Sequence, residues 1–292
     1  MKWFSFVALS AATVLPCGAT GQPPQVAPQV GDTYELTLQR DSKEESSDGS
    51  SGSTHDRWTV VERVIAVRDD GLELEYDHPD DVSAEEKASD WQLPARVFKP
   101  AHGPAQLLNT AELETRIDSW LKAAKLTRAM CGRWIFTWNA FQIECDPQSV
   151  LKTVQGYDLR SIELHEGLPY QMKGALRAAP LTKRQGGSDG TIFTAHLDVD
   201  QDAVRRSRAE SDVVLGEIMQ KPIALDAAIQ ARAKQSISGT ILVTFETDAA
   251  GQARRRTTVT NLQVKEPDGR LTNETITEVL ERQAAARSGM SH

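Results

Sequence analysis

Two cysteines bracket the most aromatic stretch of the chain, the segment CGRWIFTWNAFQIEC that begins at Cys131 and ends at Cys145. Such a thiol pair can carry redox chemistry, bind a metal or form a structural disulfide. Redox pairs usually have the Cys-x-x-Cys spacing and structural zinc needs four ligands, whereas no histidine lies near either cysteine. A hairpin centred on Trp138, with its loop at 137–139, would place the two cysteines opposite each other. We therefore predict a disulfide that stabilises the fold by about 3 kcal/mol.

Other patterns with a chemical meaning are incomplete. The segment GGSDG around Ser188 matches Gly-x-Ser-x-Gly, but a nucleophile elbow needs a following helix, and a strand pattern follows here. The acidic segment that begins at Asp198 has Ala203 where a calcium loop needs glycine and Ala209 where it needs glutamate. The six histidines show no metal-ligand spacing. We predict no catalytic residue, no metal and no cofactor.

The tryptophans have two interpretations. Their large rings usually pack in a core or against a sheet. The alternative is that some of them line an apolar groove for a lipid or a peptide. The candidates for such a lining are Trp58, Trp91, Trp120, Trp134 and Trp138.

The N-terminus has the order of a secretory signal. Lys2 precedes an apolar run over residues 3–15, which is too short to span a bilayer, and small residues follow at 17–19. We predict a signal peptide over 1–21, a Pro-rich linker over 22–31, and a periplasmic or secreted protein with no membrane span after cleavage. The segment VLPC also resembles a degraded lipobox, so the alternative is a lipid anchor on Cys17, although Pro16 departs from that pattern.

Composition and net charge limit the kinds of partner that the protein can bind. The 292 residues carry 33 Lys and Arg against 41 Asp and Glu, a net charge of −8 that repels phosphate backbones. Basic clusters at 205–208 and 254–256 have no interleaved aromatic residues, and a solvated surface explains them better than a nucleic-acid site. We predict no nucleic-acid partner.

Alternation of apolar and polar residues dominates the remaining chain, for example over 33–38, 72–77 and 193–198. Turn signals at Gly71, Gly251 and Gly269 separate consecutive strands, as in an antiparallel meander. Helical patterns occupy few segments, among them 109–124 and 201–234, the latter broken near Pro222.

These patterns predict an α+β fold, a large curved antiparallel sheet that resembles a half-barrel, with a few helices packed on one face. We expect a single β-rich domain over 32–287 and a disordered tail over 288–292. The polar segment 41–56, which is rich in Ser and Gly, is predicted to be a flexible loop inside this domain.

The order of the segments VGDTYELTL, RVIAVRDDGLELEY, PARVFKP and GPAQLLN, followed by a capped helix, resembles uncharacterised exported bacterial proteins with a domain of unknown function. In pattern the chain is also distantly similar to half-barrel periplasmic proteins that carry lipoproteins or lipids. The first resemblance implies no activity. The second implies binding of a hydrophobic ligand and gives no catalytic residues.

We therefore expect an exported, non-enzymatic protein that binds a hydrophobic ligand or a protein partner through the concave face of its sheet. The alternative is an exported hydrolase whose catalytic residues converge only in the folded chain. A serine within hydrogen-bond reach of a histidine that is itself paired with an aspartate would favour this alternative.

Overall fold

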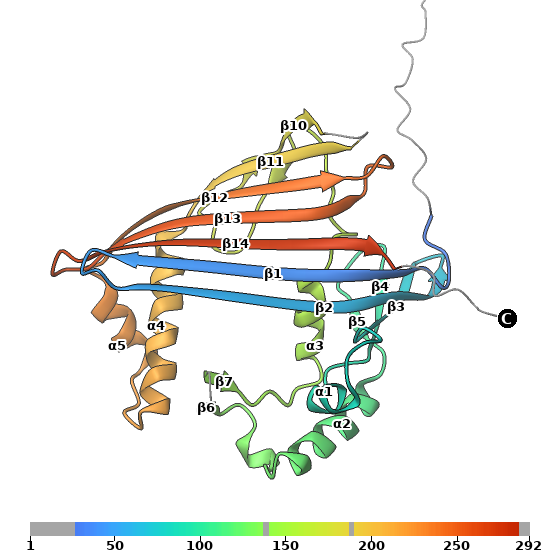
Figure 1. Ribbon diagram of the computed structural model, residues 1–292, viewed down its shortest axis with the longest axis horizontal. Coiled ribbons are helices and arrows are strands. Elements are labelled where there is room, and N and C mark those ends of the chain that lie inside the picture. The colour runs from blue at the N-terminus through green and yellow to red at the C-terminus, as the bar shows by residue number, and fades with distance from the viewer. Residues whose placement is uncertain (1–26, 137–139, 187–189, 286–292) are drawn as a thin grey trace, which may run out of the picture.

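The strands form one open antiparallel sheet of ten strands in the order β10-β11-β12-β13-β14-β1-β2-β3-β4-β5. The computed structural model (Figure 1) describes residues 27–136, 140–186 and 190–285. The strands are β1 (Thr33–Ser46), β2 (Ser51–Arg68), β3 (Gly71–Asp77), β4 (Ala95–Pro100), β5 (Gln106–Leu107), β10 (Thr182–Gln185), β11 (Thr191–Asp198), β12 (Ser236–Thr247), β13 (Ala253–Lys265) and β14 (Leu271–Ala284).

The first and last strands of the chain pair in the middle of this sheet. β1 runs antiparallel to β14, with Tyr34 opposite Ala284 and Ser46 opposite Thr272. On either side of this pair the order follows the sequence, so each half is the predicted meander. The predicted turns at Gly71, Gly251 and Gly269 join consecutive strands. Because both termini of the folded region enter one sheet, the two halves of the chain hold each other in place.

The prediction of a flexible loop over 41–56 is wrong. β1 continues to Ser46 and β2 begins at Ser51, so most of this polar segment is a hairpin. Its side chains are largely exposed, but the backbone of β1 pairs with β2 on one side and with β14 on the other. Backbone hydrogen bonds on both edges stabilise the strand without an apolar stripe. Low hydrophobicity here therefore marks a solvated extension of the sheet.

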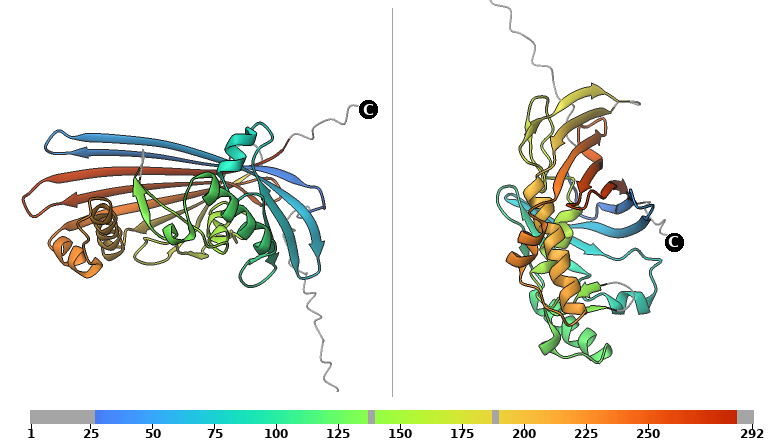
Figure 2. Two further views of the ribbon diagram at one scale, coloured as in Figure 1. Left: turned by 90° about the horizontal axis from the view of Figure 1, so that it is seen from below. Right: turned by 90° about the vertical axis from the view of Figure 1, so that its left-hand side faces the viewer.

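The helices pack on one face of the sheet, which curves around them (Figure 2). This confirms the predicted fold class. The helices are α1 (Ala84–Ser89), α2 (Thr110–Ala123), α3 (Ser149–Gly156), α4 (Gln201–Ile218), α5 (Leu225–Arg232) and the 3-10 helix η1 (Arg128–Met130). Two small hairpins complete the structure: β6 (Trp134–Phe136) with β7 (Ala140–Gln142), and β8 (Pro169–Tyr170) with β9 (Ala179–Pro180). None of the helices in the described chain is long and apolar enough to cross a bilayer.

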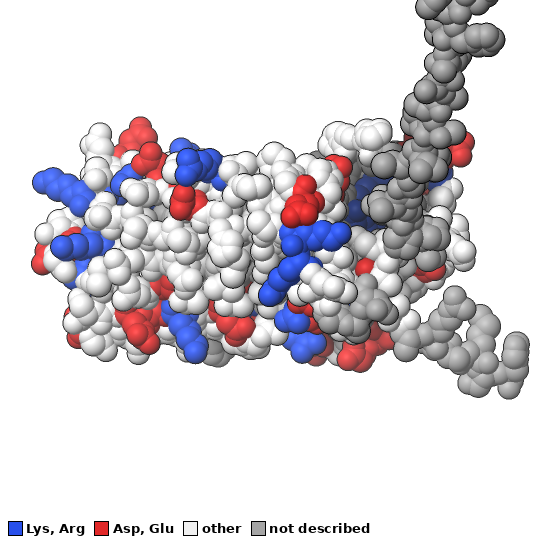
Figure 3. All heavy atoms as spheres, turned by 90° about the horizontal axis from the view of Figure 1, so that it is seen from above, with Lys and Arg blue, Asp and Glu red and all other residues white. Residues whose placement is uncertain are grey.

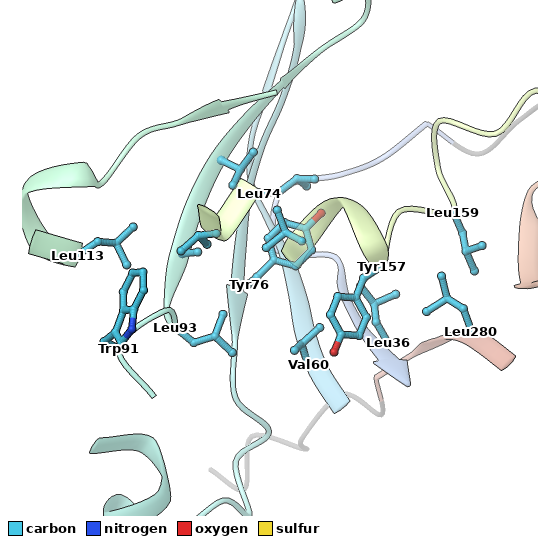
Figure 4. Packing of buried hydrophobic residues seen from close by; sticks show 14 of the residues in the cluster. Leu36, Val60, Leu74, Tyr76, Trp91, Leu93, Leu113, Tyr157, Leu159 and Leu280 are labelled. Carbon is cyan, nitrogen blue, oxygen red and sulfur yellow. The ribbon is translucent and has the colours of Figure 1, made fainter. Parts of the chain in front are cut away.

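Two clusters of buried side chains lie between the sheet and the helical layer. One cluster joins β1–β4 to α2 and α3 and includes Leu36, Leu74 and Leu113, which are fully buried (Figure 4). The other lies on β11–β13 and is centred on Phe245 and Val243. The two central strands bury few side chains: Leu36 is the one buried residue of β1, and Thr272 and Leu280 are those of β14. The helical layer therefore leaves part of the concave face of the sheet uncovered.

Candidate functional site

The cysteine hairpin is structural. Cys131 and Cys145 form a disulfide with their Cα atoms 5.6 Å apart. Ile135 pairs with Phe141 in the predicted register, and Ile143 is fully buried. Both sulfur atoms are used by the bond, so the disulfide interpretation is confirmed. The hairpin loop at 137–139, with Trp138, lies outside the described residues.

The concave face of the sheet is defined by strand register. Leu36 lies opposite Val60 and Leu38 lies opposite Trp58, so these four side chains share one face of β1 and β2. Leu36 and Val60 are buried under the helical layer. Trp58 is 45% exposed, although it is the next residue along the same face. The cover of helices therefore ends between Val60 and Trp58.

A cavity of about 570 Å³ opens at this boundary. Its floor is the sheet, with Leu38, Trp58 and Val60. One wall is the C-terminal end of α3 with Tyr157, which Figure 4 shows beside Val60, and another is the segment before β4 with Leu93. The volume falls within the range of small-molecule sites, which are concave and mostly apolar. Three segments that are distant in sequence thus build one apolar pocket.

Polar side chains also line this pocket. His78 Nε2 lies 3.5 Å from Asp90 Oδ2, and both residues line the cavity. Burial raises the pKa of the Tyr157 hydroxyl to about 12, and the charge of Asp90 adds to this shift. Tyr157 therefore stays a neutral hydrogen-bond donor at physiological pH. The arrangement suits an apolar ligand with a polar end.

The other tryptophans that the structure describes do not line this pocket. Trp91 is only 6% exposed and belongs to the core cluster. Trp120 packs against the same cluster from α2, and Trp134 lies in the β6–β7 hairpin. Among the described tryptophans, Trp58 alone lines the cavity. The alternation of side chains along β2 puts Trp58 on the same face as Val60. This local pattern cannot show where the cover of helices ends.

A second group of polar residues was missed by sequence reasoning. Glu62 lies on the concave face between Tyr34 and Tyr76 of the neighbouring strands and is only 2% exposed. Its Oε1 accepts a hydrogen bond of 2.8 Å from Arg160 Nε, and Arg282 Nη2 lies 3.5 Å from the same oxygen. The signal was present in the sequence, because the alternation of Val60 and Val64 makes position 62 inward-facing.

This group is held together by aromatic rings and hydrogen bonds. The guanidinium carbons of Arg160 and Arg282 lie 4.8 and 3.4 Å from the centroid of the Tyr34 ring. Tyr76 donates its hydroxyl to Glu62 Oε2 at 3.1 Å. Burial, followed by the charge of Glu62, raises the pKa of Tyr76 well above its ordinary value. The group is a buried, hydrogen-bonded network with two positive charges and one negative charge.

The described residues do not assemble a hydrolytic triad. Histidine pairs with a carboxylate at His55–Asp41, His78–Asp90 and His165–Glu163. No serine hydroxyl hydrogen-bonds any of these histidines in the part of the chain that the structure describes. Within the same part, no group of three or more His, Cys, Asp or Glu could hold a metal. Ser188 and Cys17 lie outside the described residues.

Charge on the surface is mixed in sign. On the side of the molecule shown in Figure 3, basic and acidic side chains are interspersed. Within the basic cluster 205–208, Arg206 pairs with Glu210 and Arg208 with Glu266. Arg255 lies 3.3 Å from Glu281. Paired arginines of this kind do not form the extended basic stripe that nucleic acid requires.

No family model matches the chain, and no curated protein matches it. Several solved structures show distant similarity, among them the three that follow. A lipovitellin structure on lipid–protein interactions is 9% identical with a TM-score of 0.35 and covers 90% of this chain, which spans only 26% of lipovitellin. Neisserial surface protein A is 7% identical (TM-score 0.21; 87% and 97% covered), and an outer membrane channel from Pseudomonas putida F1 is 9% identical (TM-score 0.21; 88% and 97% covered). Similarities at this level support no functional argument.

Proposed function

We propose that this protein is an exported, non-enzymatic binding protein that holds a hydrophobic ligand in the cavity at Trp58. The observation that carries the proposal is the 45% exposure of an indole ring inside a 570 Å³ cavity with apolar walls. A concave site lined mostly by apolar and aromatic side chains, with a few polar groups, is the arrangement that small-molecule sites use.

Covering the Trp58 ring would contribute to the free energy of ligand binding. A tryptophan buries up to about 250 Å² of surface. Covering a little under half of it, at about 25 cal/mol per Å², gives about 2–3 kcal/mol from one residue. Leu38, Leu93 and Tyr157 add further apolar contact. We expect an acyl chain to lie against these walls with its polar end toward His78.

Export rests on two features. Structural disulfides form in oxidising compartments, and the Cys131–Cys145 bond is of this kind. The sequence of residues 1–21 has the order of a signal peptide, as described above. Together these two features support the proposal of a periplasmic or secreted location. The alternative of a lipid anchor on Cys17 would change the attachment of the protein and not its cavity.

The test is binding of an environment-sensitive dye and its displacement by a panel of acyl chains. Wild-type protein should bind the dye, and ligand should raise the melting temperature by mass action. Trp58→Ala should weaken binding about 30-fold, as expected for loss of about 2 kcal/mol. Trp134→Ala is the matched control, because Trp134 does not line the cavity, and it should bind like wild type. Equal affinity in both variants, or no binding by wild type, would contradict the proposal.

A further inference from the structure

A second cavity, of about 440 Å³, lies beside residues 159–162 of the loop that follows α3. The β2–β3 turn, the β12–β13 turn and residues 159–162 surround it. It shares no lining residue with the Trp58 cavity. Its apolar walls include Leu72, Leu159, Ile162 and Ala253. This cavity is therefore a separate candidate site.

The charges that line this cavity are mostly positive. Arg68, Lys99, Arg160 and Arg282 line it, and Asp69 is the only carboxylate among its lining residues. Arg68 is paired with Glu73 at 2.8 Å, and Lys99 with Asp158 at 2.5 Å. Arg160 and Arg282 share the single carboxylate of Glu62. Asp69 is exposed and forms no ion pair with either arginine in the described chain, so the buried group of Glu62, Arg160 and Arg282 carries one surplus positive charge.

This surplus charge is buried. The side chains of Arg160 and Arg282 are 11% and 8% exposed. Burial lowers the pKa of the Arg282 guanidinium, and the neighbouring positive charge of Arg160 lowers it further. A guanidinium nevertheless stays protonated at physiological pH. Burying a charge without a counter-charge is costly, so this arrangement favours an anion.

Among the residues that line this cavity, two buried donors have no hydrogen-bond partner within the described chain. They are Nη2 of Arg160 and Nε of Arg282. An unsatisfied donor on a charged group costs more than a neutral one. Both arginines line the same cavity, so a small rotation of the guanidinium groups would let an oxyanion with two oxygen atoms accept from both.

We propose that this cavity binds a carboxylate or phosphate group, to which Arg160 and Arg282 donate hydrogen bonds. The walls around Leu159 and Ile162 then receive an apolar chain attached to that group. The ligand class is an anionic amphiphile, and a free carboxylate or phosphate is the second source of the same oxyanion. The proposal does not depend on ligand binding at Trp58.

The test is isothermal titration of the full protein with dodecanoate, dodecyl phosphate, dodecanol, acetate and inorganic phosphate, each below its micellar concentration. Dodecanoate or dodecyl phosphate should bind at least about tenfold more tightly than dodecanol. This difference in affinity corresponds to the contribution of one hydrogen bond to a charged group. If acetate or inorganic phosphate binds as tightly as the amphiphiles, the source is the free anion. Equal affinity for dodecanoate and dodecanol, or no binding of any anion, would overturn the proposal.

Substitutions in the lining test whether the anion binds in this cavity. Arg282→Gln should weaken anion binding about tenfold or more. Arg68→Gln is the matched control, because Arg68 lines the same cavity but is half exposed and has its own partner, and it should change affinity less than about twofold. Trp58→Ala should leave the preference for dodecanoate over dodecanol unchanged, which separates this proposal from the proposed function. An unchanged affinity in Arg282→Gln would overturn the assignment.

Because Arg282→Gln also removes an ion-pair partner of Glu62 and can unfold the protein, a second variant gives the opposite signal. Glu62→Gln removes the carboxylate that competes for both guanidiniums. We expect this variant to bind anions more tightly than wild type, and added anion to raise its melting temperature more. Loss of stability alone would not produce tighter binding. Weaker or unchanged binding by folded Glu62→Gln would overturn the proposal.

Discussion

Replacement of Glu62 by glutamine tests the buried charge network most sharply. The glutamate is 2% exposed and serves both Arg160 and Arg282. Removing one partner of a buried ion pair costs about 3–5 kcal/mol. Glutamine keeps the size of the side chain and one oxygen acceptor, so we expect the lower end, about 3 kcal/mol. With an m-value near the top of the usual range, the urea midpoint should fall by about 1 M.

Glu75 on the neighbouring strand is a matched control. It too lies between two arginines, with Arg63 Nη1 at 3.0 Å and Arg96 Nε at 3.7 Å. Those arginine side chains are 43% and 44% exposed, so water screens their interaction with Glu75. Glu75→Gln should therefore cost less than about 1 kcal/mol. Equal losses in the two variants, measured by urea unfolding at low anion concentration, would refute the reasoning that burial makes the Glu62 network strong.

Three further predictions concern stability. Replacing Cys131 and Cys145 together by serine opens a 15-residue loop and should cost about 3 kcal/mol in urea unfolding; unchanged stability would show that the bond does not constrain the unfolded chain. Burial opposes ionisation of Asp158, but its lysine partner and hydrogen bonds outweigh this and lower its pKa. The charged form therefore contributes stability above about pH 3.9, the ordinary value for aspartate, and this contribution disappears as the pH falls through the lowered pKa. Asp158→Asn should be less stable at pH 7 and should lose less stability than wild type in acid, as unfolding at a series of pH values would show; parallel pH profiles would contradict it. Gly71→Ala should cost about 1–3 kcal/mol, because a Cβ there would clash with a backbone carbonyl oxygen of β4. Gly52→Ala, with nothing within 4 Å, should be neutral by thermal melting.

Local patterns in the sequence predicted the strands and their turns, because alternation and turn residues act over a few positions. The same reasoning failed at 41–56, where pairing of β1 with both neighbours stabilises a polar strand. The partner β14 is more than 200 residues away in the sequence. Pairing over that distance leaves no local signal, so a polar strand and a polar loop look alike in the sequence.

The candidate sites were only partly predictable for the same reason. Trp58 was among the candidate lining residues, but its exposure depends on where α3 ends and on Leu93, which the chain brings together from distant segments. Glu62 occupies an inward-facing position in an alternating strand, which already marks a buried charge. Its arginine partners at 160 and 282 follow from the tertiary fold and from no local motif.

The central claim, that a hydrophobic ligand occupies the cavity at Trp58, is tested most directly by photocrosslinking with a fatty acid that carries a diazirine in its chain. Peptide mapping by mass spectrometry should find the label on β2 near Trp58 and on the segment near Leu93, and an excess of unlabelled fatty acid should remove it; label near Leu159 and Ile162 reports the second cavity. Labelling confined to exposed apolar side chains elsewhere, such as Leu215 and Met219 at the end of α4, would contradict the claim. So would labelling near Trp58 that unlabelled fatty acid does not compete away.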